Sequence, residues 1–136
     1  MPFSLSKVVV DTFAATMRDL IDWTGDPGTI RWFSGPAPDP DDPADPTTLL
    51  AETVLAWPCG DVEGGSLYFY GIAEDNYTRG GADVEWARVY DGADAPVFDF
   101  DITDVGGGGV VEMDDREIEP GKVFRVLSLQ ISFPRY

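Results

Sequence analysis

Glycine and proline divide most of this chain into short segments, and that division favours strands joined by turns. The sequence contains 15 glycines and 11 prolines. Glycine supplies the backbone conformations that tight turns need, and proline cannot donate a backbone hydrogen bond. Between these turn signals lie six segments with strand character, at residues 29–34, 48–56, 66–73, 83–90, 96–102 and 123–133. The pattern predicts a mainly β protein, either an antiparallel β-sandwich or a jelly-roll-like barrel.

Alternation within segment 96–102 indicates which of its faces is buried. Phe98, Phe100 and Ile102 point one way, while Asp99 and Asp101 point the other. This is the pattern of a half-buried antiparallel strand with one face in water.

The last segment, 123–133, is predicted to be the longest strand. One of its faces is apolar apart from Arg125, which we expect where that face reaches the edge of the sheet. The apolar members of this face are Val123, Leu127, Leu129, Ile131 and Phe133, and the opposite face carries Phe124, Val126, Ser128, Gln130 and Ser132.

An amphipathic helix is predicted within residues 1–26. Ser4 or Ser6 can cap its start, Gly25 is placed to end it, and Pro27 prevents its continuation. We expect the helix to pack on a single β domain formed by residues 27–136; the alternative is docking against a neighbouring subunit. Its apolar residues recur every three or four positions, and they are Val9, Val10, Phe13, Met17, Leu20 and Ile21.

The charge of the chain and its lack of histidine argue against several classes of function. Twenty-five acidic and nine basic residues give a formal charge of −16, which repels nucleic-acid phosphates and anionic membranes. Histidine, which this chain lacks, is the usual general base and the commonest metal ligand near neutral pH. We therefore expect a protein that is not an enzyme, holds no cofactor or metal, and binds neither nucleic acid nor membrane.

The N-terminal residues lack the basic region and long apolar run of a signal peptide, and no stretch reaches the length that spans a bilayer. Synthesis and folding in a cytoplasm are therefore expected. The single cysteine, Cys59, cannot form a disulfide within the chain or a cysteine-based metal site.

Two acidic clusters are candidate cation sites. The Asp-Pro loop, residues 35–46, carries Asp39, Asp41, Asp42 and Asp45, but it lacks the spacing, turn glycine and closing glutamate of an EF-hand. We interpret it as an extended, solvated loop, and calcium binding there is left open. The second cluster is interpreted as a wet sheet face and consists of Asp99, Asp101, Asp104, Glu112, Asp114 and Asp115.

Other residue types that support catalysis lack the partners that catalysis needs. Paired carboxylates can hydrolyse glycosides without histidine, but Glu63, Glu74 and Glu85 lie in no motif that would raise a pKa or place a sugar. The run 106–109 lacks the Lys-Ser/Thr of a phosphate loop and predicts a flexible hairpin or loop. Cys59 is predicted to be a small buried hydrophobe. Three serines, Ser34, Ser66 and Ser128, have no base within sequence reach.

Aromatic side chains are numerous, and core filling accounts for most of them. The remainder could serve a subunit interface, where aromatic residues are enriched, or a platform for carbohydrate. We expect the helix face and two tryptophans, Trp32 and Trp57, to be contact surfaces. The aromatic set considered is Trp23, Trp32, Trp57, Trp86, Tyr68, Phe69, Tyr70, Tyr77 and Tyr90.

The order of short motifs resembles a known family. After the helix come IRWFSGPA at 30–37, TLLAE at 48–52, ARVYDG at 87–92, VFD at 97–99 and IEPGKV at 118–123. This order is similar to that of small β-rich virion structural proteins of tailed bacteriophages, in which a Tyr/Phe-Ser/Thr-Gly-x-x-Pro turn precedes an LLA strand. The resemblance covers most of the chain, although the Asp-Pro loop is more acidic than the usual loop there.

The resemblance implies a structural role without chemistry. A head decoration or cement protein of this kind binds the outside of the capsid lattice, so the implied partner is the major capsid protein and the implied location is the virion. A symmetric homo-oligomer, for example a trimer, would match the lattice. The alternatives are a head–tail connector or tail component, a carbohydrate-binding surface module and, last, a carboxylate-based glycosidase.

Overall fold

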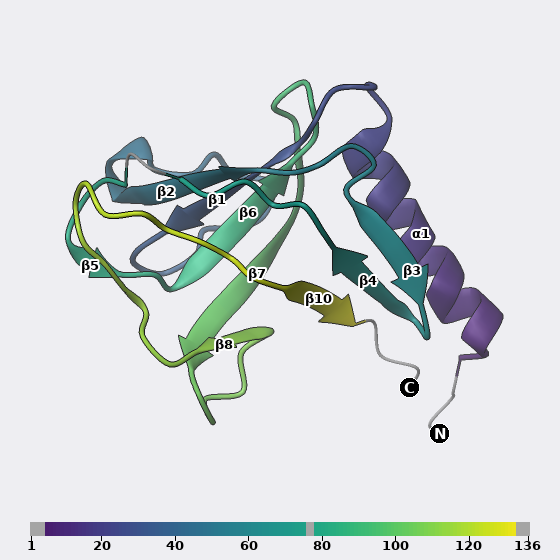
Figure 1. Cartoon of the computed structure of the whole chain (residues 1–136). Coiled ribbons are helices and arrows are strands. Elements are labelled where there is room, and N and C mark those ends of the chain that lie inside the picture. Colours follow the sequence, from purple (N-terminus) through teal and green to yellow (C-terminus); the bar gives the residue numbers. More distant parts are fainter. Residues whose placement is uncertain (1–4, 76–77, 133–136) are drawn as a thin grey trace.

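The computed structural model describes residues 5–75 and 78–132, and within them the protein is mainly β with one N-terminal helix, as predicted (Figure 1). The chain order is α1 (Lys7–Asp22), β1 (Thr29–Phe33), the 3₁₀ turn η1 (Pro46–Thr48), β2 (Leu49–Val54), β3 (Gly60–Glu63), β4 (Ser66–Phe69), β5 (Ala82–Asp83), β6 (Trp86–Tyr90), β7 (Pro96–Asp104), β8 (Val111–Met113), β9 (Glu117–Ile118) and β10 (Leu129–Ser132).

The strands form one large and two small sheets. The large sheet has the order β2-β1-β6-β7-β8, a second sheet has the order β10-β4-β3, and β5 pairs with β9. The large sheet curls into a half-barrel, with α1 beside β3 and β4 at one end of the molecule (Figure 1). Neighbouring strands in the described residues are antiparallel except for β7 and β8, which run parallel. The sheet is therefore mixed rather than purely antiparallel.

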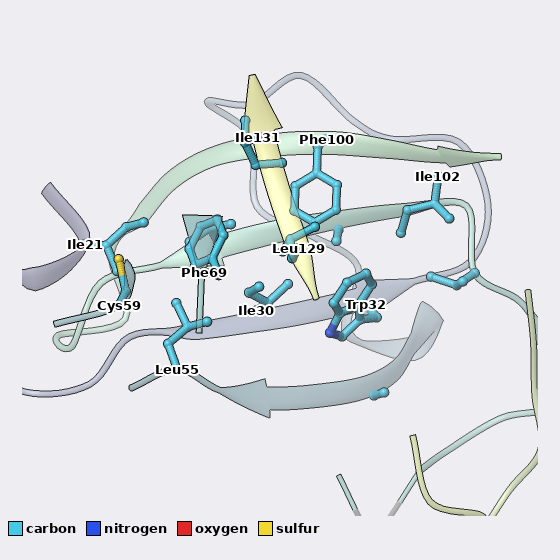
Figure 2. Close-up of a cluster of buried hydrophobic side chains, with 14 of the residues drawn as sticks. Ile21, Ile30, Trp32, Leu55, Cys59, Phe69, Phe100, Ile102, Leu129 and Ile131 are labelled. Carbon is cyan, nitrogen blue, oxygen red and sulfur yellow. The ribbon is translucent and has the colours of Figure 1, made fainter. Parts of the chain in front are cut away.

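The core lies between the large sheet, the β10-β4-β3 sheet and α1 (Figure 2). Trp32 of β1 is fully buried in it and meets the rings of Phe100 and Phe124 edge-on, at centroid distances of 5.7 and 5.1 Å. Its indole N–H donates to Thr53 Oγ1 at 3.0 Å, so the one polar atom of this side chain has a partner inside the core. Ile21 of α1 and Ile131 of β10 belong to the same cluster.

Helix α1 begins and ends close to the predicted positions. Ser6 is the N-cap, and its hydroxyl accepts from the amide of Val9. The amide of Gly25 donates to the carbonyl of Asp22 at 3.1 Å, and Gly25 adopts φ +80°, a conformation that glycine tolerates best.

The predicted apolar face of α1 is only partly buried. Val10 and Ile21 are buried together with Ala14, which the prediction did not include. Three members of the predicted face are exposed instead: Val9 at 37%, Phe13 at 46% and Leu20 at 48%. The core is too narrow to cover the whole apolar face, because α1 packs at one end of the sheets.

The prediction of a long final strand is wrong for residues 123–128. Strand β10 begins only at Leu129, and upstream of it Phe124 forms a single bridge with Asp75. Val123 and Leu127 are exposed although they were assigned to the buried face. Phe133 lies outside the described residues, and the longest described strand is β7.

Candidate functional site: the outer sheet face beneath the Asp-Pro loop

The large sheet has a second face, turned away from the core, that the Asp-Pro loop partly covers. Strand alternation sends Ala87 and Val89 into the core, so the residues between them point outward. The register places Phe33 opposite Trp86 and Arg31 opposite Arg88. We call this surface the outer face, and it comprises Arg31, Phe33, Trp86, Arg88, Tyr90, Asp99 and Asp101.

A buried ion pair lies at the centre of the outer face. Arg88 is 1% exposed, and its register partner on β7 is Asp99. The guanidinium donates to Asp99 from Nε at 2.7 Å and from Nη2 at 2.9 Å. This bidentate geometry is the strong form of an arginine–carboxylate pair. These hydrogen bonds raise the pKa of Arg88 above its usual value, against the opposing effect of burial.

The same guanidinium binds the Asp-Pro loop through main-chain carbonyls. Nη1 of Arg88 donates to the carbonyl of Asp42 at 2.6 Å, and Nη2 donates to the carbonyl of Asp39 at 3.3 Å. Within the loop, the Asp39 carboxylate accepts from the amide of Asp41, and the Asp45 carboxylate accepts from the amide and hydroxyl of Thr47. The loop therefore has a defined shape, although its acidic side chains face solvent as predicted.

The positively charged group that the Asp-Pro loop contacts is thus the Arg88 guanidinium. Carbonyl oxygens that could have been calcium ligands are occupied by Arg88. Within residues 5–75 and 78–132, no three acidic or cysteine side chains come together in an arrangement suited to a metal ion. The hydrogen bonds from Thr47 lower the pKa of Asp45, which keeps that carboxylate ionised.

Aromatic rings and a second arginine complete the outer face. Trp86 stacks on Phe33 at a centroid distance of 4.4 Å. Arg31 lies 4.2 Å above the Tyr90 ring and pairs with Glu52 at 2.8 Å. Burial opposes the charge of Arg31, but its hydrogen bond and attraction to Glu52 outweigh burial and raise its pKa. The result is a surface of planar groups held in place by ion pairs.

Two pockets open beside the Asp-Pro loop. One, of about 380 Å³, has Trp86 as its aromatic wall and lies between the segments 34–38 and 43–48. The other, of about 180 Å³, lies beside Arg31 and Tyr90. Both combine apolar walls with a few polar groups.

Asp91 connects the outer-face hairpin to the end of α1. It is only 4% exposed and accepts from the Trp23 indole N–H at 2.7 Å and from the amides of Ala93 and Ala95 at 2.8 and 2.9 Å. Burial alone would raise its pKa, but these hydrogen bonds stabilise the charged form and lower it.

The second predicted acidic cluster is not one wet surface. Asp99 is largely buried against Arg88, so the prediction of a solvent-facing side chain is wrong for it. Asp101 is exposed and accepts from the amide of Val110. Asp104 pairs with Arg116 at 2.9 Å, and these contacts lower the pKa of Asp104 and raise that of Arg116. Glu112 caps the glycine run.

Hydrogen bonds to nearby side chains hold the glycine run 106–109 in place. The Glu112 carboxylate accepts from the amide of Gly106 at 2.9 Å and from that of Gly108 at 3.3 Å. The amide of Gly109 donates to the hydroxyl of Thr103. The backbone donors that resemble a phosphate cradle are therefore used within the protein.

The remaining catalytic candidates are not brought together with one another. Glu74 pairs with Arg125, and Glu85 accepts from the amide of Gly35. Cys59 is fully buried as predicted, and burial, followed by the nearby Asp22 charge, raises the pKa of its thiol to about 12. Such a thiol is a poor nucleophile. The Ser34 hydroxyl donates to the carbonyl of Thr48, and the hydroxyls of Ser66 and Ser132 are hydrogen-bonded to each other. Ser128 is exposed.

The aromatic residues divide between core and surface. Trp32 is fully buried, so the prediction that it forms a contact surface is wrong; Trp57 is 52% exposed and remains available for one. Trp23 is 68% exposed, whereas Trp86 lies beneath the Asp-Pro loop at 2%. Tyr77 lies outside the described residues.

Sequence reasoning missed Arg88 and its role. One signal in the sequence pointed to it, because Arg88 is the single charge in the otherwise apolar strand β6. In the structure, the hairpin that joins β6 to β7 pairs Val89 with Phe98. That register places Arg88 opposite Asp99. The contact of Arg88 with two loop carbonyls had no such signal, because a main-chain carbonyl is present at every residue.

Taken together, the aromatic rings and Arg88 of the outer face are buried beneath or beside the Asp-Pro loop, and two pockets open next to that loop. No described helix has the length and apolarity required to cross a membrane. The sequence matches no family model, no curated protein and no solved structure in the comparisons made.

Proposed function

We propose that this protein is a non-enzymatic structural component of a tailed-bacteriophage virion, and that it decorates the head by binding the major capsid protein. The proposal rests on the motif resemblance, and one structural observation supports it. The motifs at 30–37, 48–52, 87–92 and 97–99 lie on β1, β2, β6 and β7, which are adjacent strands of one sheet. Four of the five motifs therefore lie on one continuous structural unit, whereas the fifth, at 118–123, begins at β9 and lies outside this sheet.

We assign contact with the capsid to the exposed side of the Asp-Pro loop. Arg88 already holds the loop in one conformation through the carbonyls of Asp39 and Asp42. Binding through a preformed loop costs little ordering entropy. Its carboxylates suit a basic patch on the partner, and a protein that binds only the assembled lattice stabilises that lattice by mass action.

The copy number of this chain in purified virions tests the proposal. Quantitative mass spectrometry should give a ratio to the major capsid protein near one or a simple fraction of one. A handful of copies per particle would instead support a head–tail connector or tail component. Absence of the chain from virions would overturn the proposal.

A pair of charge reversals tests the assigned surface. Asp41 and Asp114 are both exposed, and within residues 5–75 and 78–132 neither side chain forms a hydrogen bond or ion pair. Asp41→Lys should weaken binding to capsids that lack the protein, and Asp114→Lys should leave binding nearly unchanged. Equal effects of the two substitutions would show that only net charge matters.

A second candidate function is carbohydrate binding, and one observation favours it. Tyr68 on the outside of the β10-β4-β3 sheet is 40% exposed and lies in register between Asp61 and Gln130. An aromatic ring flanked by polar side chains is a common sugar platform. Titration of glycans against intrinsic fluorescence should then show saturable binding that Tyr68→Ala abolishes, and no change with any glycan would remove this candidate.

A further inference from the structure

Helix α1 presents an exposed stripe that carries no charge. Val9, Phe13, Thr16 and Leu20 are spaced by four, three and four residues, so they follow one side of the helix. All four are exposed. The charged residues of α1 lie on its other sides; they are Lys7, Asp11, Arg18, Asp19 and Asp22. In a chain with a formal charge of −16, an uncharged exposed stripe along a whole helix requires an explanation.

The threonine hydroxyls on this side of the helix already have hydrogen-bond partners within the helix, so they do not require water as a partner. The Thr16 hydroxyl donates to the carbonyl of Thr12 at 2.8 Å, and the Thr12 hydroxyl donates to the carbonyl of Val8 at 2.7 Å. Covering these side chains therefore leaves no unpaired hydroxyl, and the penalty for burying an unsatisfied polar group does not arise. The stripe can be covered completely by an apolar partner.

Two tryptophans lie at the C-terminal end of α1. The indole N–H of Trp23 donates to Asp91 and that of Trp57 donates to the carbonyl of Asp22, so both polar atoms are already bonded within the protein. Their rings nevertheless remain 68% and 52% exposed. Exposed tryptophans of this kind are typical anchors of protein interfaces.

The stripe is complementary to itself when two helices run antiparallel. A two-fold axis between positions 14 and 15 brings Val9 of one copy opposite Leu20 of the other. The same axis places the large Phe13 opposite the small Thr16, and it places Trp23 over the first turn of the second helix. A two-fold contact requires this kind of self-complementarity.

We propose that α1 binds α1 of a second copy of this chain in an antiparallel pair. The exposed parts of Val9, Phe13, Leu20, Trp23 and Trp57 amount to roughly 500 Å² per copy, from typical side-chain areas. Two copies would therefore bury about 1,000 Å², which is the lower limit for a specific interface. Because the rest of each copy is acidic, the pair should strengthen as salt screens the repulsion.

Sedimentation equilibrium of the full chain, across a concentration series in low and high salt, tests the pairing. We expect dimers that Phe13→Glu weakens more than about tenfold. Val8→Glu is the matched control, because Val8 is on the same helix and 73% exposed but lies off the stripe. Circular dichroism would verify that both variants fold. A monomer under all conditions, a trimer, or equal effects of the two variants would overturn the proposal.

Crosslinking tests the antiparallel direction independently. With the axis between positions 14 and 15, the two copies of Thr16 are offset along the helix by about 4–5 Å and the two copies of Val9 by about 16 Å. Thr16→Cys should crosslink with a short bismaleimide and Val9→Cys should not, while buried Cys59 stays unmodified. Efficient crosslinking of both variants would indicate parallel helices, and of neither would overturn the pairing.

Discussion

Arg88 and Asp99 lie directly opposite each other on β6 and β7, joined by two hydrogen bonds of 2.7 and 2.9 Å. Their side chains are only 2% and 12% exposed. The buried charge of Arg88 is therefore stabilised by one carboxylate and by the loop carbonyls of Asp39 and Asp42, which accept its hydrogen bonds. The stability of the outer face and the conformation of the Asp-Pro loop are linked through this residue.

Removal of the Asp99 charge should strongly destabilise the fold. Asp99→Asn leaves the Arg88 guanidinium buried without a counter-charge, which costs about 3–5 kcal/mol in comparable buried pairs. Urea denaturation measures this loss of unfolding free energy. The control Asp41→Asn, at an exposed loop side chain that forms no hydrogen bond with any other described residue, should stay within about 0.5 kcal/mol of the wild type. A small effect of Asp99→Asn would mean that the pair is not buried in solution.

Asp91 should contribute stability that acid removes. Its folded pKa is lower than the ordinary 3.8, so its contribution is fully present above that value and is lost as pH falls through the folded pKa. The difference in unfolding free energy between wild type and Asp91→Asn should therefore be largest near neutral pH and shrink below about pH 4. Denaturant unfolding at several pH values measures it, and a difference independent of pH would contradict the role of the Asp91 charge.

Cys59 should be nearly inert towards thiol reagents while the protein is folded. Raising its thiol pKa from 9.0 to about 12 reduces the thiolate fraction at pH 8 by about a thousandfold. Ellman's reagent should react slowly with the native protein and rapidly once denaturant unfolds it. Reaction at the rate of a free cysteine without denaturant would show that Cys59 is accessible.

Glu112 should control the mobility of the glycine run. Glu112→Ala removes the acceptor for the amides of Gly106 and Gly108, so hydrogen exchange at those amides should accelerate several-fold. Glu117→Ala is the control, because the Glu117 side chain is exposed and accepts no hydrogen bond from the part of the chain that the structure describes. Unchanged exchange in Glu112→Ala would indicate that the backbone alone holds the loop.

Alternation of apolar and polar residues predicted those strands that have one buried and one exposed face along their whole length. In β7, Phe100 and Ile102 are buried and Asp101 is exposed, as predicted. The same reasoning failed at residues 123–128, because the buried side changes along the segment. Phe124 and Val126 are half-buried, whereas Leu129 and Ile131 of the opposite parity are buried further on. A strand that is interrupted cannot be recognised from alternation alone.

The helix and the site differ in what the sequence could reveal. The spacing of residues identified the apolar side chains of α1, but it could not show how many of them the core covers. Whether Phe13 and Leu20 are buried depends on the width of the sheets, and both are exposed. The burial of Arg88 depends on a loop that folds back onto the sheet from more than forty residues earlier in the chain. Local patterns carry no information about such a contact.

The attachment of the Asp-Pro loop through its main chain has an evolutionary consequence. Arg88 binds carbonyl oxygens, which every amino acid at positions 39 and 42 would present. Substitutions there can change the charge and shape of the exposed surface while the clamp remains. Related chains could therefore diverge rapidly in this loop, and so adapt to different partners, while Arg88 and Asp99 stay invariant.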